Sequence, residues 1–271
     1  MKLNTTSETI KHFIFKSGEN HIQLLNDYSG HQLDLFFQYS GDQSLFKLAM
    51  IVDALKRQGY VDLSLVIPYF PGARQDRVCN SGEALSVKVY ADFINNMGFR
   101  KVSVFDPHSD VVAAVVNNCR VVKNHAFVAK AIEKHPSNYV LVSPDAGANK
   151  KIFDLAKHLG GPRVIRADKI RNVVDGAIIG TEVYADDLTG ETCYIVDDIC
   201  SGGRTFVELA KKLKEKNAAK IILIVSHYEG VANKELLKQS GINNVITTNS
   251  LPNACMTSGD FLKVLNISDF I

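Results

Sequence analysis

Short apolar stretches alternate with segments of helical period along most of this chain. Six stretches are apolar and rich in β-branched residues, and they cover residues 63–67, 101–105, 139–143, 163–166, 194–196 and 221–225. Strands that are buried on both faces of a parallel sheet have this composition. Leu48, Val52 and Leu55 recur at helical spacing between two of these stretches, and so do the apolar positions of residues 206–213. The repeated alternation of strand and helix predicts an α/β fold with helices covering parallel sheets.

The alternation of strand and helix occurs twice along the chain. It runs to about His135 and begins again at Tyr139, with the polar sequence HPSN between the two runs. The length of 271 residues also fits two domains at roughly 100–200 residues each. We therefore expect two similar doubly wound parallel-sheet domains, over residues 1–137 and 138–271.

Composition and charge narrow the class of protein. Hydrophobic residues make up 46% and charged residues 22% of the chain, and the net charge is only +2. Nucleic-acid binding needs a concentrated basic surface, so a nucleic-acid partner is not expected. Five cysteines without metal-type spacing and the lack of an apolar leader or membrane span favour the reducing cytoplasm and no membrane partner.

The segment VDDICSGGRT, residues 196–205, is the most informative one for chemistry. An apolar strand leads to Asp197 and Asp198, and the loop Ser201–Thr205 then precedes a helix. Amides at a helix N-terminus bind phosphate, and strand-end carboxylates accept hydrogen bonds from ribose hydroxyls. The alternative is an ordinary strand-to-helix turn with two solvated aspartates.

Two motifs together resemble one enzyme family. VDDICSGGRT resembles the phosphoribosyl-diphosphate loop of type I phosphoribosyltransferases, and LVIPYFPGARQDRV, residues 65–78, resembles the ATP-binding segment of ribose-phosphate pyrophosphokinases. Six further segments of this chain also match the family, and they occur in the same order as in the family. They are FKSGE, SLFKLAMIVDALKRQG, SVKVYADFI, DPH, SPDAG and ADKIR. The resemblance covers nearly the whole chain and implies two domains of the type I phosphoribosyltransferase kind.

The resemblance assigns ATP contacts to two segments of the first half. They comprise Phe15, Glu19, Arg74, Gln75, Asp76 and Arg77. In the family, the residues matching Phe15 and Glu19 hold adenine from a neighbouring subunit, which implies a homo-oligomer built from dimers, usually a hexamer. Arg can pair bidentately with phosphate and Gln can bond a purine edge, whereas the alternative is a solvated loop in which Arg77 pairs with Asp76. The family has Asp where this chain has Ser17.

The resemblance also assigns a metal pair and two catalytic cations. His108 and Asp145, which follow strands, would hold Mg²⁺ on the triphosphate. A lone histidine after a strand is otherwise more often a structural hydrogen-bonder. Lys169 and Arg171 match a mobile loop that closes over the reacting phosphates; without the resemblance they are solvated surface cations.

The activity implied by the resemblance is transfer of the β,γ-diphosphoryl group of ATP to the anomeric hydroxyl of a ribose 5-phosphate unit, with release of AMP. The family typically reads VDDxxDTGGT, so this loop has Ser201 for Asp, Gly202 for Thr and Arg204 for Gly. The loss of a carboxylate and gain of a guanidinium leave two acceptors open, free ribose 5-phosphate and ADP-ribose, which would connect the enzyme to NAD metabolism. A phosphoribosyltransferase and an inert regulatory paralogue are the alternative functions.

Overall fold

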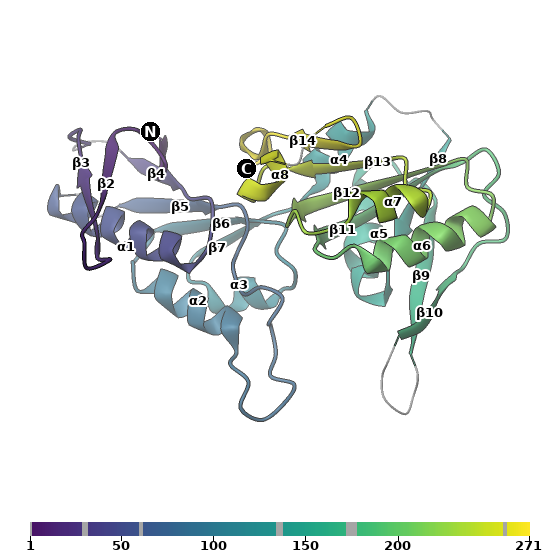
Figure 1. Cartoon of the computed structure of the whole chain (residues 1–271), viewed down its shortest axis with the longest axis horizontal. Coiled ribbons are helices and arrows are strands. Elements are labelled where there is room, and N and C mark those ends of the chain that lie inside the picture. Colours follow the sequence, from purple (N-terminus) through teal and green to yellow (C-terminus); the bar gives the residue numbers. More distant parts are fainter. Residues whose placement is uncertain (1, 29–31, 60–61, 134–137, 172–177, 257–258) are drawn as a thin grey trace. The chain divides into compact units, whose positions relative to one another are not determined.

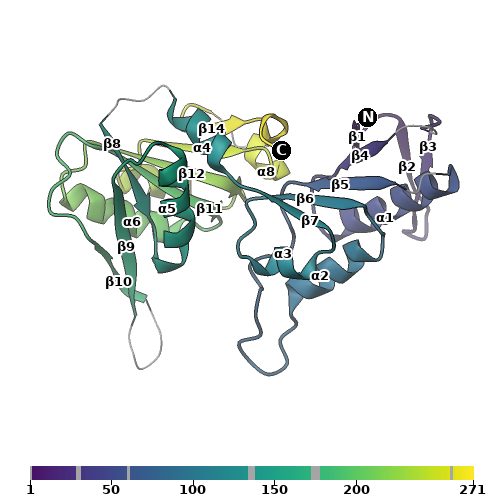
Figure 2. The same cartoon turned by 180° about the vertical axis from the view of Figure 1, so that it is seen from behind.

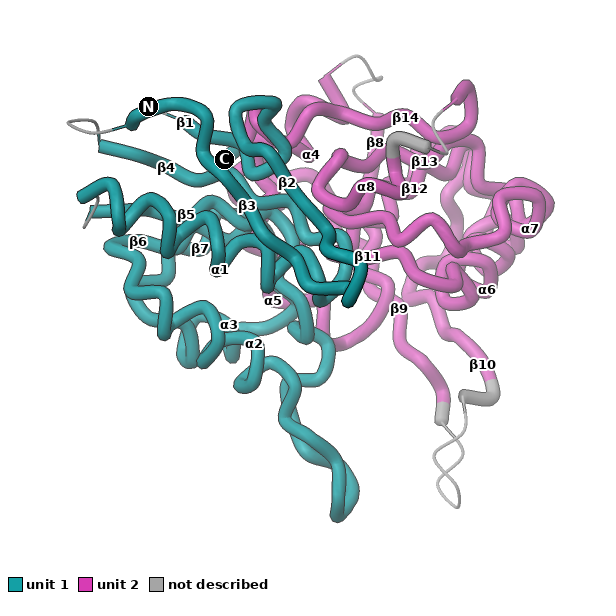
Figure 3. The backbone as a smooth tube through the Cα atoms, turned by 60° about the vertical axis from the view of Figure 1, so that its left-hand side comes forward, with its two compact units in different colours: residues 1–123, 271 teal, residues 124–270 magenta. Residues whose placement is uncertain are grey.

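The computed structural model describes residues 2–28, 32–59, 62–133, 138–171, 178–256 and 259–271. The chain forms two compact units, residues 1–123 with residue 271, and residues 124–270 (Figure 3). Each unit contains one parallel or mainly parallel sheet with its own hydrophobic core. The α/β fold class with parallel sheets that was expected from the sequence is confirmed.

The boundary between the units lies before helix α4 (His125–Ile132), whereas the sequence analysis placed it after residue 137. Helix α4 packs on the second unit, where the ring of Phe127 meets that of Phe270 edge-on with centroids 5.7 Å apart. Phe127, Val128 and Ala131 are the buried residues of this helix. A sequence pattern alone identifies this apolar stripe but not the sheet that it covers.

The first unit contains a five-stranded parallel sheet in the order β1-β4-β5-β6-β7. Its strands are β1 (Lys2–Asn4), β4 (Leu33–Phe36), β5 (Leu63–Ile67), β6 (Lys101–Phe105) and β7 (Cys119–Val122). In the sequence, a separate hairpin of β2 (Ile10–Ile14) and β3 (Asn20–Leu24) comes between β1 and β4, which pair directly with each other in the sheet. The strands follow one another across this sheet without a reversal of order.

Three helices connect the strands of this sheet and lie on the same face of it (Figures 1 and 2). They are α1 (Asp42–Arg57), α2 (Ser86–Asn95) and α3 (Val111–Val115). Helix α1 has its apolar stripe in the core, with Leu48, Ile51 and Leu55 fully buried. Burial of each such side chain stabilises the fold by about 1.5–3 kcal/mol relative to leaving it exposed. The helix is thereby anchored, and its first turn lies at the carboxyl edge of the sheet.

The second unit contains a seven-stranded sheet in the order β10-β9-β8-β11-β12-β13-β14. Its strands are β8 (Tyr139–Ser143), β9 (Val164–Arg171), β10 (Ile178–Val183), β11 (Thr192–Cys200), β12 (Lys220–Tyr228), β13 (Asn244–Thr248) and β14 (Leu262–Leu265). Strand β10 is antiparallel to β9, and all the other pairs are parallel. From β8 the chain proceeds to β9 on one side and later to β11 on the other, so the strand order reverses between β8 and β11.

Helices cover both faces of the second sheet. They are η1 (Ala146–Ala148), α5 (Asn149–His158), α6 (Arg204–Glu215), α7 (Lys234–Gln239), α8 (Pro252–Met256) and η2 (Ile267–Asp269), together with α4. Helices α6 and α7 lie in front of the sheet in Figure 1, and α4 and α5 lie in front of it after the half-turn of Figure 2. This unit is therefore doubly wound, as expected. Among the described residues, no helix has the length and apolar character needed to cross a membrane.

Candidate active site

The reversal of strand order in the second unit places three carboxylates close together. Asp145 comes just after β8, and Asp197 and Asp198 lie near the carboxyl end of the adjacent strand β11. In open α/β sheets, ligands bind in the crevice outside the carboxyl ends of the two strands that flank such a reversal. The predicted ribose-phosphate residues are therefore at the position where this architecture binds ligands.

Asp145 is fixed by the turn that follows β8. Its backbone is extended (φ −162°, ψ 176°), and its Oδ1 atom accepts a hydrogen bond of 3.1 Å from the N–H of Ala148, the last residue of the short helix η1. Ser143 Oγ donates to the Asp145 carbonyl at 3.1 Å. The carboxylate is therefore held by one oxygen, which leaves Oδ2 for another partner.

Lys169 supplies that partner. Its Nζ donates to Asp145 Oδ2 at 2.7 Å, and the two side chains are only 21% and 33% exposed. Lys169 lies in β9 and is paired with Thr181 of β10. The segment matched to a mobile loop is therefore strand through residue 171, and residues 172–177 lie outside the described part. The side chain of Arg171 also lies outside the described residues.

Asp197 and Asp198 differ in their electrostatic environment from ordinary surface aspartates. Asp198 is 8% exposed, and its backbone N–H donates to Asp197 Oδ1 at 2.8 Å. Burial, and then the charge of Asp198, raise the pKa of Asp197 well above its usual range, and the charge of Asp145 adds to the effect. Two neighbouring carboxylates in a desolvated crevice favour a bound cation or hydroxyl donors.

The loop after β11 leads directly into the N-terminus of α6. Gly203 precedes the helix in the left-handed conformation (φ +78°), and a Cβ there would come within 3.3 Å of Ala232 and Leu237. Gly202 faces open space, and Arg204 is exposed at the first helical position. A helix N-terminus attracts anions through its dipole and its backbone N–H groups. Ser201 to Thr205 thus form a positively polarised end beside the carboxylates.

In the first unit, Phe15 and Glu19 close the β2–β3 hairpin. The Phe15 N–H donates to the Glu19 carbonyl at 2.8 Å, and the Phe15 side chain is 56% exposed. Ser17, which stands where the family has Asp, donates from Oγ to Glu19 Oε2 at 2.5 Å. An exposed aromatic ring beside a carboxylate suits a planar base with exocyclic amino groups.

The loop that follows β5 contains the predicted phosphate contacts. Arg74, Gln75 and Arg77 are exposed, whereas the Asp76 side chain is only 5% exposed. Arg77 donates to both carboxylate oxygens of Asp76, at 2.8 and 3.2 Å, and these bonds are the largest cause of a lowered Asp76 pKa. The arrangement of Arg77 paired with Asp76, which the sequence analysis kept as the alternative, is therefore present in this structure.

His108 lies at the same edge of the first sheet, after β6. Its charge contributes to the lowered pKa of Asp76, which places the two residues near each other. Asp106 has a positive φ of 39°. Left-handed backbone at a non-glycine residue is uncommon and often occurs at functional sites. This unusual backbone lies just after the end of β6, and Pro107 and His108 follow it.

The predicted metal ligands lie in different units, His108 in the first and Asp145 in the second. The described residues include no group of three His, Cys, Asp or Glu side chains able to hold a metal ion. Mg²⁺ commonly takes one or two carboxylates and completes its shell with water and phosphate. Asp145 and the nearby Asp197 provide hard oxygen ligands of this kind, so the residues fit a magnesium ion held mainly by substrate phosphates.

A cluster of tyrosines, which the sequence did not predict, lies beside the loop that leads to Arg74–Arg77. Tyr39 and Tyr90 both donate to Asp42 at the start of α1. No motif indicated these contacts, since the residues are far apart in sequence and belong to different elements. The tyrosine pairing with a carboxylate is visible only in three dimensions.

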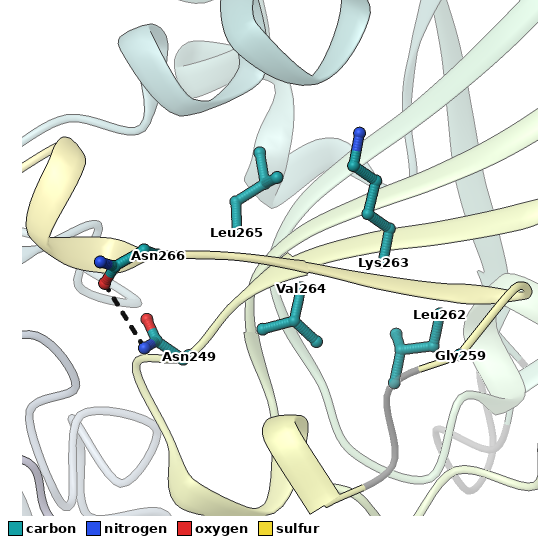
Figure 4. Close-up of a pocket in the computed structure, with 7 residues that line it drawn as sticks. All are labelled: Asn249, Gly259, Leu262, Lys263, Val264, Leu265 and Asn266. Carbon is teal, nitrogen blue, oxygen red and sulfur yellow. Dashed lines mark hydrogen bonds between the residues drawn. The ribbon is translucent and has the colours of Figure 1, made fainter.

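A hollow of about 450 Å³ at the edge strand β14 lies outside these groups of residues (Figure 4). Its polar lining is Asn249, Lys263 and Asn266, without a carboxylate. The asparagines accept backbone N–H bonds from Ile267 and Ser268 and so stabilise the chain after β14. The hollow therefore lacks the carboxylate and phosphate-binding groups of the β8–β11 crevice.

Comparisons with known proteins agree with this geometry. Residues 1–98 match the N-terminal domain of ribose phosphate pyrophosphokinase, and residues 177–271 match a phosphoribosyl synthetase-associated domain. A ribose-phosphate pyrophosphokinase of Thermosipho africanus is 31% identical over 256 residues, which cover 88% of this chain and 78% of the relative. One from Shewanella oneidensis is 31% identical over 94% of this chain and 81% of its own.

A solved structure has the same fold. Phosphoribosylpyrophosphate synthetase from Mycobacterium smegmatis superposes with a TM-score of 0.83 and 24% identity, over 96% of this chain and 86% of its own. The relatives at 31% identity, of which this chain covers more than two thirds, establish the family. The chain belongs to the ribose-phosphate pyrophosphokinases, a family of diphosphotransferases, as its two motifs predicted.

Proposed function

We propose that this protein transfers the β,γ-diphosphoryl group of ATP to the anomeric hydroxyl of ribose 5-phosphate and releases AMP. The observation that carries the proposal is the crevice between β8 and β11, where Asp197 and Asp198 adjoin the N-terminus of α6. Carboxylates and a helix N-terminus match the vicinal hydroxyls and the phosphate of the sugar. The relatives named ribose-phosphate pyrophosphokinase support the same reaction.

At the acceptor end, the side chains bind and orient the sugar. Asp197 and Asp198 accept hydrogen bonds from the ribose hydroxyls, and residues 201–205 hold the 5-phosphate at the end of α6. Fixing both ends of the sugar aligns its anomeric oxygen for attack, which supplies a large part of the rate enhancement in a reaction without a protein nucleophile.

At the donor end, the exposed side chains of the first unit bind ATP. Arg74 and Arg77 contact phosphate oxygens, Gln75 contacts the purine, and Asp76 orients Arg77 through the bidentate pair already present. Phe15 and Glu19 hold the adenine of a neighbouring subunit's site, which makes the working enzyme a homo-oligomer, built from dimers and possibly a hexamer. The buried free cysteines Cys193 and Cys200 are consistent with a reducing cytoplasm.

In the transfer step, the anomeric oxygen forms a bond to the β-phosphorus and loses its proton to water. The bond from the β-phosphorus to the oxygen that bridges it to the α-phosphorus breaks, and AMP leaves with that electron pair. Lys169 and Arg171 stabilise the charge that develops on the transferred group and on AMP. His108 and Asp145 are the proposed protein ligands of a magnesium ion, which would supply charge neutralisation on the phosphates.

The test is to incubate the protein with ATP, Mg²⁺ and ribose 5-phosphate, to follow AMP and to identify the sugar product by mass. We expect AMP and a ribose 5-phosphate carrying one added diphosphate in equal amounts. Release of AMP would exclude a phosphoribosyltransferase, which does not cleave ATP in this way. Intact ATP with every acceptor would instead support an inert regulatory paralogue.

ADP-ribose is a second candidate acceptor because of the loop between β11 and α6. Gly202 faces open space and Arg204 is exposed, so the loop has both room and positive charge beyond a single phosphate. ADP-ribose carries a diphosphate and adenosine at the position of the 5-phosphate. Comparison of kcat/KM for the two acceptors, with the product identified by mass, decides between them. A strong preference for ribose 5-phosphate would limit Ser201, Gly202 and Arg204 to a tolerated variant of the usual loop.

A further inference from the structure

Three side chains of the first unit form one hydrogen-bonded group. Tyr39 OH donates to Asp42 Oδ1 at 2.8 Å, and Tyr90 OH donates to the same oxygen at 2.7 Å. Asp42 is the first residue of α1, Tyr39 precedes that helix, and Tyr90 lies in α2. A single carboxylate oxygen thus connects two helices at the carboxyl edge of the sheet.

Both tyrosine rings also contact the loop that carries Arg74 to Arg77. The ring of Tyr39 lies 6.2 Å from that of Tyr69, and a Cβ at Gly72 would come within 2.5 Å of the Tyr90 ring. Gly72 has a φ of +71°, so only glycine allows both this backbone shape and the close approach of the ring. The loop is therefore packed against one tyrosine near its beginning and against the other at its turn.

The turn at Gly72 is continuous with the ATP-binding residues. Gln75 N–H donates to the Gly72 carbonyl at 3.0 Å, and Val87 N–H donates to the Gln75 carbonyl at 3.4 Å. Helix α2 thus holds the loop through the Tyr90 ring and through the Val87 amide. A displacement of the Tyr90 ring would reach Gln75 through its contact with Gly72 and the hydrogen bond from Gln75 to Gly72.

The charge states of Asp42, Tyr39 and Tyr90 favour strong hydrogen bonds between them. The hydrogen bonds from Tyr90 and Tyr39 lower the pKa of Asp42, and burial is the main cause of the raised pKa of both tyrosines. At neutral pH the carboxylate is ionised and the phenols are protonated. Hydrogen bonds with an ionised partner are about twice as strong as neutral ones.

We propose that Asp42, Tyr39 and Tyr90 are positioning residues that hold the loop from Gly72 to Arg77 in the shape that binds ATP. The inference rests on the proposed function, because it gives that loop its ligand. None of the three residues needs to touch ATP. They act by fixing the backbone from which Arg74, Gln75 and Arg77 project, so they set the affinity for ATP and not that for the sugar acceptor.

The test uses Tyr39→Phe, Tyr90→Phe, the double variant and Asp42→Asn, with Asp92→Asn as the control. Asp92 lies in the same helix as Tyr90 and is paired with Lys88 at the surface, outside the loop. The measurements are equilibrium binding of a non-hydrolysable ATP analogue with Mg²⁺, KM for ATP and for ribose 5-phosphate, the melting temperature, and amide hydrogen exchange of residues 72–77 without ligand.

We expect each Tyr→Phe variant to weaken ATP-analogue binding and to raise KM for ATP about tenfold. KM for ribose 5-phosphate should stay within about twofold, and the amides of residues 72–77 should exchange faster. Unchanged ATP binding, or equal rises in both KM values, would overturn the inference. A lower melting temperature with unchanged loop exchange would also overturn it, because the role would then be purely structural.

The wild-type protein separates the inference from the proposed function. If it neither binds the ATP analogue nor releases AMP, the proposed function fails and the inference fails with it. If the wild type turns over normally and the tyrosine variants behave like Asp92→Asn, only the inference fails.

Discussion

Lys169 and Asp145 form an ion pair of 2.7 Å that connects β9 to the turn after β8. In this pair, the Lys169 ammonium occupies Asp145 Oδ2, which is the oxygen that would otherwise be available to a metal ion. A magnesium ion held by Asp145, as proposed, would compete with the Lys169 ammonium for this oxygen. Binding of a triphosphate would offer Lys169 other anionic partners and free the carboxylate for the metal. Under the proposed function, both residues would therefore exchange this ion pair for substrate and metal contacts.

Replacing Lys169 by Ala should reduce turnover by about 10²–10³-fold, a typical loss for one transition-state contact. ATP-analogue binding should fall far less than turnover, because most of the residues proposed to hold ATP lie in the first unit. The measurements are kcat from AMP release and analogue affinity by calorimetry. Lys212→Ala is the matched control, since Lys212 is paired with Glu215 on the surface of α6. Equal AMP release by Lys169→Ala and the control would contradict the catalytic role.

Replacing Asp145 by Asn should raise the magnesium concentration needed for half-maximal rate about tenfold or more. Asn keeps an oxygen that can accept the Ala148 N–H bond, but it loses the charge that attracts the cation. The measurement is the rate as a function of Mg²⁺ at fixed ATP, together with the melting temperature. An unchanged magnesium requirement with a lowered melting temperature would instead assign Asp145 a structural role.

The raised pKa of Asp197 predicts that the ionised carboxylate, which is proposed to bind the ribose hydroxyls, lowers the stability of the folded protein. Burial and the charge of Asp198 raise this pKa above its value in the unfolded chain, so folding favours the protonated form. The stability that this proton provides is fully present below the unfolded pKa of about 3.9, and it is lost as pH rises through the folded pKa. At neutral pH the ionised group opposes folding.

Asp197→Asn should therefore melt at a higher temperature than the wild type at pH 7–8 and lose most of its activity. The difference in melting temperature should shrink as pH is lowered towards 4, where the wild-type carboxyl is protonated. Thermal melts without ligand from pH 4 to 8 measure this. A variant that is less stable than the wild type at pH 8 would show that the Asp197 carboxylate has a stabilising partner instead.

The sequence predicts the central strands better than the edges of the two sheets. Leu63–Ile67 and Tyr139–Ser143 were predicted with the observed bounds, because strands covered on both faces are continuously apolar. The short edge strands Lys2–Asn4 and Leu262–Leu265 were missed, since three or four residues carry too little pattern. Strand Ile178–Val183 contains glycine and polar residues and is recognised only by its pairing with β9.

The motifs located the candidate site residues but not the contacts between them. Asp145 and Lys169 were both named, yet their pairing depends on how β9 is placed next to β8, which residue spacing does not specify. The bonds from Tyr39 and Tyr90 to Asp42 were missed for the same reason. Chemistry that depends on tertiary contacts needs the three-dimensional arrangement.

The two glycines before α6 should respond differently to substitution by Ala. A Cβ at Gly203 would meet Ala232 and Leu237 at 3.3 Å on a backbone with φ +78°, so Gly203→Ala should lower the melting temperature. Gly202→Ala adds a methyl group in open space and should leave the melting temperature within about 1 °C, while raising KM for the acceptor. Thermal melts and acceptor titrations measure both effects. An unaffected KM in Gly202→Ala would place the acceptor phosphate away from this residue.

Arg204 provides the last prediction, which concerns the choice of acceptor. It occupies the first position of α6 and is exposed, so its guanidinium adds to the positive end of the helix. A single 5-phosphate can be held by the loop amides alone, whereas a diphosphate presents further oxygens that suit a bidentate guanidinium. Arg204→Ala should lower kcat/KM for ADP-ribose about tenfold and that for ribose 5-phosphate less than threefold.

The control for Arg204→Ala is Lys211→Ala, which removes an exposed cation of the same helix that is paired with Glu208. The control should leave both acceptors unaffected, which excludes a general effect of the helix charge. Both kcat/KM values are measured at two salt concentrations, because a local guanidinium–phosphate contact is screened less than a long-range field. Equal losses for both acceptors would place Arg204 on the 5-phosphate that they share. No loss for either would remove Arg204 from the acceptor site, and the case for ADP-ribose would then rest on Gly202 alone.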